Sequence, residues 1–204
     1  MRARVAPWIV AFALAALPAA ALAGSYSEFV SGDISGNRAA PTSLTLDLGD
    51  NPISGTTVAG DLDYITVLAP GAITALLLTQ FDTANPLELA FVAIQAGTTF
   101  TEPNTGTNVA NLLGYSHIGL PTGTDYLPLL GAGAGAIGFT PPLTGPAYTF
   151  WIQQTGANLV NYTLDVVVPE PSALALLGLA AAALTQRRVS RALASHRPRA
   201  RSLS

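Results

Sequence analysis

The chain has 204 residues, of which 50% are hydrophobic and only 10% are charged, and it contains no cysteine. A disulfide framework and a thiolate metal site are therefore excluded, and the length allows one ordinary domain plus targeting segments. The basic residues are all arginines, and only Arg38 lies in the middle of the chain, where almost all of the acidic residues are found. This acidic middle region argues against a nucleic-acid partner.

The N-terminal stretch 1–23 has the three parts of a secretory signal peptide, namely a charged start, an apolar segment and a small-residue cleavage site. The short apolar run argues against the alternative, an N-terminal membrane anchor. We expect signal peptidase to remove this stretch during export. The three parts are Arg2 and Arg4, residues 5–17, and Ala21 and Ala23 followed by Gly24 as the first mature residue.

The region 24–168 has the pattern of an all-β domain. Apolar and polar residues alternate with a period of two, and no apolar pattern of helical period runs through it. We predict an antiparallel two-sheet sandwich of jelly-roll type. We expect strands over 44–48, 62–68, 73–80, 88–95, 148–153 and 162–166, turns at 49–52, 141–142 and 155–158, and a long surface loop over 98–108.

Four short strings in this region have counterparts in a known class of domain. They are residues 31–35, 60–64, 69–71 and 148–156. These strings resemble bacterial pre-peptidase C-terminal-type domains, which are extracellular sandwiches that accompany secreted enzymes or stand in surface proteins. The resemblance implies a β-sandwich and no particular activity.

The C-terminal part of the chain places three devices in series. Pro169, Glu170 and Pro171 come first, and the two prolines prevent the preceding strand from continuing into a helix. An apolar, helix-forming run over 173–184 follows. A helix over 172–185 would be roughly 21 Å long, against about 30 Å for a hydrocarbon core, which predicts a transient rather than a permanent membrane span.

The third device is a cluster of arginines, which favours the cytoplasmic side of the membrane and would orient the helix. The cluster consists of Arg187, Arg188 and Arg191. We predict a disordered basic tail over 189–204. This series resembles the PEP-CTERM sorting signal of exported bacterial proteins, here over 169–188. The resemblance implies that an exosortase-type membrane protease recognises Pro-Glu-Pro. It further implies a transient inner-membrane tether, then a place at the cell surface or outside the cell, in a Gram-negative host that makes exopolysaccharide or biofilm.

Candidates for catalysis are few. His117 follows Ser116, but neighbours in a strand point to opposite faces, which argues against a Ser–His pair. Residues 133–138 match the Gly-x-Gly-x-x-Gly spacing, but Pro141 and Pro142 exclude the helix that a dinucleotide site needs. We therefore predict a loop at 133–138 and a protein that is not an enzyme.

Asp61 and Asp63 are the candidate metal ligands. At positions i and i+2 of an extended segment both carboxylates point to one side, and oxygen ligands suit calcium. Asp33, Asp50 or backbone carbonyls would complete such a site. A charged, solvated strand entrance is the favoured interpretation of the pair, and a calcium site is the alternative. No obligatory cofactor is expected.

Two aromatic residues, Trp151 and Tyr126, are candidates for stacking on sugars, but core packing is the more common role of aromatic residues in a sandwich and is the favoured interpretation. The sequon at Asn161 is expected to lie on a strand and to carry no sugar. The main hypothesis is thus a non-enzymatic surface or matrix protein with a removable sorting signal. The alternative hypothesis is a calcium-assisted carbohydrate-binding or adhesion module.

Overall fold

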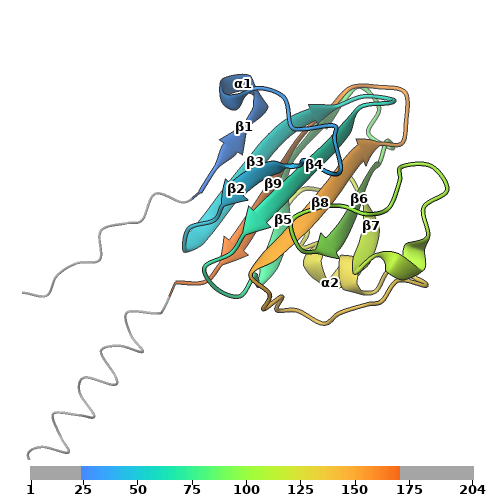
Figure 1. Cartoon of the computed structure of the whole chain (residues 1–204). Helices are drawn as coiled ribbons and strands as arrows, with labels where there is room; N and C mark the ends of the chain where they lie inside the picture. The colour runs from blue at the N-terminus through green and yellow to red at the C-terminus, as the bar shows by residue number, and fades with distance from the viewer. Residues whose placement is uncertain (1–23, 171–204) are drawn as a thin grey trace, which may run out of the picture.

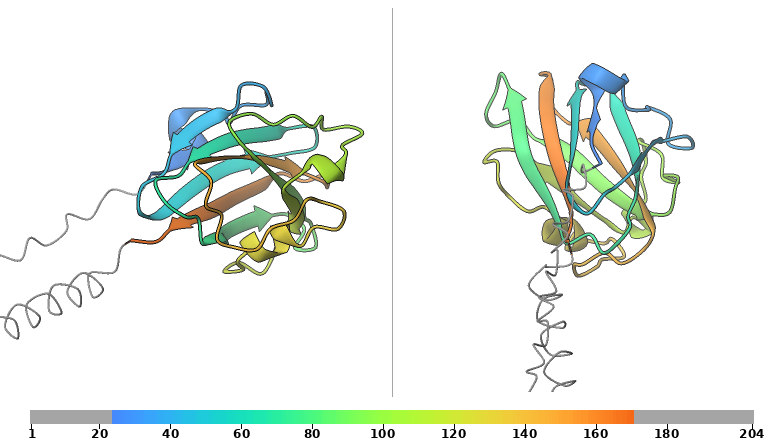
Figure 2. Two further views of the ribbon diagram at one scale, coloured as in Figure 1. Left: turned by 60° about the horizontal axis from the view of Figure 1, so that its bottom comes forward. Right: turned by 90° about the vertical axis from the view of Figure 1, so that its left-hand side faces the viewer.

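The computed structural model describes residues 24–170, which form two facing β-sheets (Figures 1 and 2). The four-stranded sheet has the order β1-β3-β9-β5, and the five-stranded sheet has the order β2-β4-β8-β6-β7. The predicted all-β, two-sheet sandwich is therefore confirmed. The elements are β1 (Tyr26–Ser27), α1 (Glu28–Ser31), β2 (Thr42–Thr45), β3 (Gly49–Thr57), β4 (Leu62–Leu68), β5 (Ala75–Thr83), β6 (Ala90–Ala96), the 3-10 helix η1 (Val109–Asn111), β7 (Gly114–Ile118), α2 (Leu127–Gly131), β8 (Ala147–Gln154) and β9 (Val160–Val168).

The chain alternates between the two sheets from β1 to β6. Alternate strands therefore run in the same direction, and β1 pairs with β3, and β2 with β4, in parallel. The last two strands run the opposite way and insert between earlier ones, β8 between β4 and β6 and β9 between β3 and β5. All of these later ladders are antiparallel, as expected, so only the two N-terminal edge pairs depart from the predicted arrangement.

The main core lies between the sheets and is built by the side chains that point inward from the strands. Ile65 on β4, Phe150 on β8 and Leu164 on β9 are each at most 2% exposed. Burying such side chains contributes about 1.5–3 kcal/mol each, which is the main stabilisation available to a domain without disulfides.

A second core covers the outer face of the five-stranded sheet. Tyr64, Trp151 and Phe100 pack there with ring centroids 5.6–6.0 Å apart. Phe100 belongs to the connection between β6 and η1, which the sequence predicts as a surface loop over 98–108. The connection has no strand or helix, as predicted, but it also buries an aromatic side chain and so acts as a lid on this face.

The prediction of a turn at 49–52 is wrong, because these residues begin β3. The buried Asn51 amide donates to the carbonyl groups of Asp47, Gly49 and Val166, which satisfies polar groups inside the sheet. Pro52 precedes the residues of β3 that pair with β1, so its missing donor faces no strand on that side.

No helix within 24–170 is both long and apolar enough to cross a membrane. The predicted signal peptide over 1–23, the apolar helix over 172–185 and the basic tail over 189–204 lie outside the described residues.

Candidate functional site

The sorting signal begins directly at the end of the last strand. Val168 is fully buried and still pairs with Gly49, whereas Pro169 and Glu170 are exposed. Because β9 is flanked by β3 and β5, its end is firmly held by the sheet. The predicted recognition motif is thus attached to the folded domain without a linker.

The opposite end of the sandwich carries a cluster of carboxylates. Glu28 comes from α1, Asp33 from the segment after it, and Asp63 from β4. One carboxylate oxygen from each lies within 4.8 Å of the others. The parallel pairing of Ser27 with Ser54 places Glu28 beside β3 and so brings it to this position.

Asp63 is the buried member of the carboxylate cluster, with no exposed surface. Its Oδ2 accepts a hydrogen bond from the Tyr162 hydroxyl at 2.7 Å, and its Oδ1 has no partner. Burial raises the pKa of the Asp63 carboxyl to about 8; the charges of Glu28, Asp61 and Asp33 add to the shift, and the Tyr162 bond opposes it. The ionised form of the buried Asp63 carboxylate therefore costs stability unless a cation binds it, and otherwise the carboxyl takes up a proton.

Glu28 is held by donors from its neighbours. One of its oxygens accepts from the Ile34 amide at 3.1 Å, and the other accepts from the Thr56 amide at 2.7 Å and the Thr56 hydroxyl at 3.0 Å. Gly55 makes this approach possible, because a Cβ there would lie 2.6 Å from the Tyr162 hydroxyl and 3.1 Å from the Glu28 carboxyl carbon. The carboxylate of Glu28 thus has a fixed position at the edge of the cluster.

The structure brings together part of the predicted metal site. Asp63 and Asp33 belong to the cluster, whereas Asp61 stands beside it, and its pKa is raised by burial and then by the charges of Asp33 and Glu28. Asp50 lies at the other end of β3, opposite Val167. The solvated strand entrance, which is the interpretation that the sequence favours, is wrong for Asp63, because this side chain is buried. Glu28 was not foreseen, because no local pattern announces its pairing with residues far along the chain.

The candidate catalytic residues do not form a catalytic pair. The Ser116 hydroxyl donates to the backbone carbonyl of His117, and the exposed His117 ring packs edge-on against Phe91, with centroids 5.7 Å apart. Residues 133–138 form a loop after α2, as predicted. This loop is fixed to β7 by the Tyr115 hydroxyl, which donates to the Ala134 carbonyl at 2.8 Å.

The candidates for sugar stacking are buried. Trp151 is 2% exposed and lies within the second core, and Tyr126 is 7% exposed and donates its hydroxyl hydrogen to the Gly119 carbonyl. Core packing, the interpretation that the sequence favours, is therefore confirmed for both rings, with Trp151 in the second core and Tyr126 in the main core. Asn161 lies on β9 between two neighbouring strands, so the predicted strand position of this sequon is confirmed.

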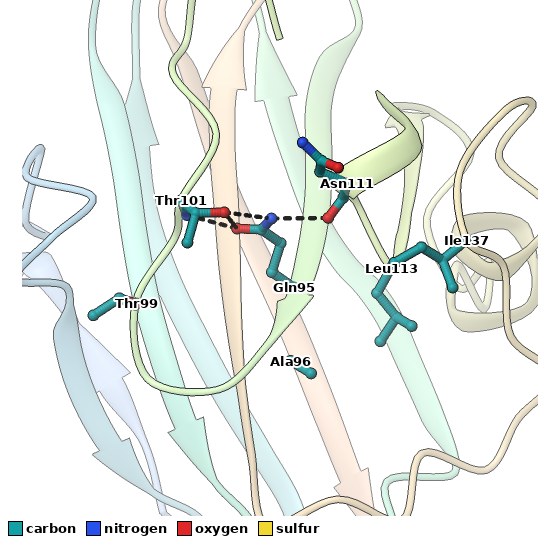
Figure 3. Close-up of a pocket in the computed structure, with 7 residues that line it drawn as sticks. All are labelled: Gln95, Ala96, Thr99, Thr101, Asn111, Leu113 and Ile137. Carbon is teal, nitrogen blue, oxygen red and sulfur yellow. Dashed lines mark hydrogen bonds between the residues drawn. The ribbon is translucent and has the colours of Figure 1, made fainter. Parts of the chain in front are cut away.

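A shallow depression of about 240 Å³ lies beside the lid on the five-stranded sheet (Figure 3). Its central polar side chain, Gln95, accepts from the Thr101 amide at 2.7 Å and donates to the Asn111 carbonyl at 2.9 Å. Gln95 therefore serves to hold the lid, and the depression is a weaker candidate for a ligand site than the carboxylate cluster.

The comparison with known families concerns the sorting end. Residues 167–189 match the PEP-CTERM protein-sorting motif. The match covers only the C-terminal part of the chain and gives no information on the sandwich. No curated protein and no solved structure matches the chain. The resemblance of the sandwich to pre-peptidase C-terminal-type domains stays a prediction.

The chain is thus an exported protein with a C-terminal sorting signal that is processed at the membrane and leads to the cell surface. It is a PEP-CTERM protein, and the processing enzyme that this motif implies is an exosortase.

Proposed function

We propose that this protein is a non-catalytic component of the bacterial cell surface or extracellular matrix. Signal peptidase would cut before Gly24, and the exosortase would cut near Pro169–Pro171 and release or transfer the sandwich outward. The observation that carries this proposal is the position of the matched motif, which starts on the last two residues of β9.

The junction gives the domain an orientation during export. A membrane helix that follows Pro171 would hold the Val168 end of β9 against the membrane. Tyr162, which contacts the carboxylate cluster, lies six residues earlier on the same strand, which is about 20 Å away at 3.3 Å per residue. The carboxylate cluster would therefore face away from the membrane.

The absence of catalysis is part of the proposal and is supported by the contacts of the candidate residues. The Ser116 hydroxyl is directed at a backbone carbonyl, and the His117 ring packs on Phe91. Neither arrangement supplies the nucleophile, base and orienting group of a hydrolase.

The test is the intact mass of the protein in membrane, surface and medium fractions of its native host. We expect a mature chain that begins at Gly24 and ends near Pro-Glu-Pro, with or without an added anchor. Pro169→Ala together with Pro171→Ala should leave the full C-terminal segment on the protein and keep it in the membrane fraction. Pro103→Ala, at an exposed loop position, is the matched control and should be processed normally.

Two results would contradict the proposal. One is a surface-located protein that retains residues 173–204, which would make the tail a permanent anchor. The other is normal processing of the double-proline variant, which would show that Pro-Glu-Pro is not the recognition element.

The alternative function, a calcium-assisted adhesion module, retains support only for its metal part. The carboxylate cluster favours a cation, whereas the rings proposed for sugar stacking are buried. Binding of the exported protein to exopolysaccharide from its host, reduced by chelator, would favour this function. Equal binding with and without chelator would remove calcium from it.

A further inference from the structure

The carboxylate cluster lacks a positively charged partner. The described residues 24–170 contain no lysine and a single arginine, Arg38. The Arg38 guanidinium donates to the carbonyl of Thr101, on the lid. Glu28, Asp33 and Asp63 therefore face one another within 4.8 Å without a basic side chain of this region beside them.

Asp63 supplies an independent sign that a group belongs there. It is completely buried, yet its Oδ1 accepts no hydrogen bond. Buried polar atoms in native proteins nearly always have a partner, and an unpaired buried charge is among the most costly features a fold can hold. The carboxylate that carries this free oxygen is the one that lies against Glu28 and Asp33.

The chemistry of the cluster selects the cation. All of the side-chain ligands are carboxylate oxygens, with no imidazole nitrogen or thiolate, which suits a hard cation such as calcium better than zinc or copper. Glu28 is fixed by the amides of Ile34 and Thr56, so one ligand is already in position. Asp33 is exposed and leaves a side open for entry and for the water ligands that calcium accepts.

We propose that Glu28, Asp33 and Asp63 bind one calcium ion, which fastens the N-terminal segment of the mature chain to the sandwich. Packing alone does little to hold α1 itself, because this helix has four residues and none of them is buried. The ion would join α1 and the segment after it to β4. The site itself does not depend on the proposed export; export would only bring it to a compartment where calcium is plentiful.

The test uses the full-length protein in mild detergent and measures calcium binding by isothermal titration calorimetry. We expect one ion per chain with a Kd of about 10⁻⁴–10⁻³ M, as in extracellular modules. At about ten times that Kd the melting temperature should be about 3–6 °C higher than in chelator.

Asp33→Asn is the decisive variant, because Asp33 is exposed and its replacement should leave folding intact. It should weaken calcium binding by about tenfold or more. Asp63→Asn should abolish binding and should melt in chelator no lower than the unchanged protein. Asp82→Asn, an exposed carboxylate near the same end, is the matched control and should bind normally.

Two results would overturn the proposal. The first is no calcium binding up to about 10 mM together with equal melting temperatures in calcium and chelator, which would mean that a proton meets Asp63 instead. The second is unchanged affinity in both Asp33→Asn and Asp63→Asn, which would place any bound ion elsewhere. Neither result bears on the processing of the sorting signal.

Discussion

Two largely buried carboxylates lie at the same end of the sandwich, and their surroundings differ. Glu88, in the β5–β6 connection, accepts from the backbone and side-chain nitrogens of Asn158 at 3.0 and 2.6 Å and from the Thr83 hydroxyl at 3.0 Å. Asp63 accepts a single bond, from Tyr162, and keeps one oxygen free.

The pKa values of the two carboxyl groups shift in opposite directions, because hydrogen-bond donors dominate at Glu88 and burial dominates at Asp63. The hydrogen bonds from Asn158 lower the pKa of Glu88, whereas burial raises that of Asp63. The protein itself therefore supplies the hydrogen-bond donors that the Glu88 carboxylate needs, whereas the Asp63 carboxylate still requires a proton or a cation. The comparison shows that a buried carboxylate indicates a ligand only after its donors have been counted.

Gly55 lies against the Tyr162 hydroxyl that bonds Asp63, and Gly156 lies against Glu88 itself, so replacing these two glycines should give the largest effect. Gly55→Ala would push a Cβ to within 2.6 Å of the Tyr162 hydroxyl, which is locked in the core, so we expect a loss of about 1–3 kcal/mol in the free energy of unfolding. Gly156→Ala meets the end of the Glu88 side chain, which can turn away by giving up its hydrogen bonds from Asn158 and Thr83, and should cost less. Urea denaturation of both variants measures the difference; a larger loss for Gly156→Ala would contradict it.

The second largest effect should be the pH dependence that the Glu88 carboxylate gives to the stability of the protein. Because its folded pKa lies below the ordinary value of 4.5, Glu88 stabilises the fold above that pH and loses this contribution as the pH falls through the folded pKa. The unchanged protein should therefore melt higher than Glu88→Gln at pH 7, and the gap should close toward pH 3. Thermal melts at both pH values test this. A gap that does not depend on pH would show that the charge of Glu88 contributes nothing.

Replacing a third carboxylate, Asp165, should change the stability least, because this side chain is less buried than Asp63. Asp165 also has an oxygen without a partner, and burial and the charge of Asp50 raise its pKa. The side chain is only half-buried, however, so water screens it. Asp165→Asn should stabilise the protein by no more than about 0.5 kcal/mol, measured by urea denaturation. A loss of stability beyond that range would mean that the Asp165 carboxylate has a structural role of its own.

The strands and the sorting signal were accessible from the sequence because both are local patterns. The run over 62–68, bounded by turn residues, predicts β4 with its observed bounds, and the alternating runs at 148–153 and 162–166 fall within β8 and β9. The motif from Pro169 onward is likewise a run of neighbouring residues. The start of β3 escaped prediction, because Asn51 and Pro52 are turn-forming residues whose place in a sheet depends on partners far along the chain.

The sequence by itself determined that the chain is exported, all-β and sorted through its C-terminal end, since composition, period-two alternation and Pro-Glu-Pro need no knowledge of distant contacts. Only the tertiary structure decided which carboxylates meet. The parallel pairing of β1 with β3 brings Glu28 to Asp63, and the facing of the two sheets brings Tyr162 to the same carboxylate. The tertiary structure also buries Trp151, because Phe100 of the lid packs on it. This contact could not be predicted from the sequence, since the lid has a position only once the sheet beneath it has formed.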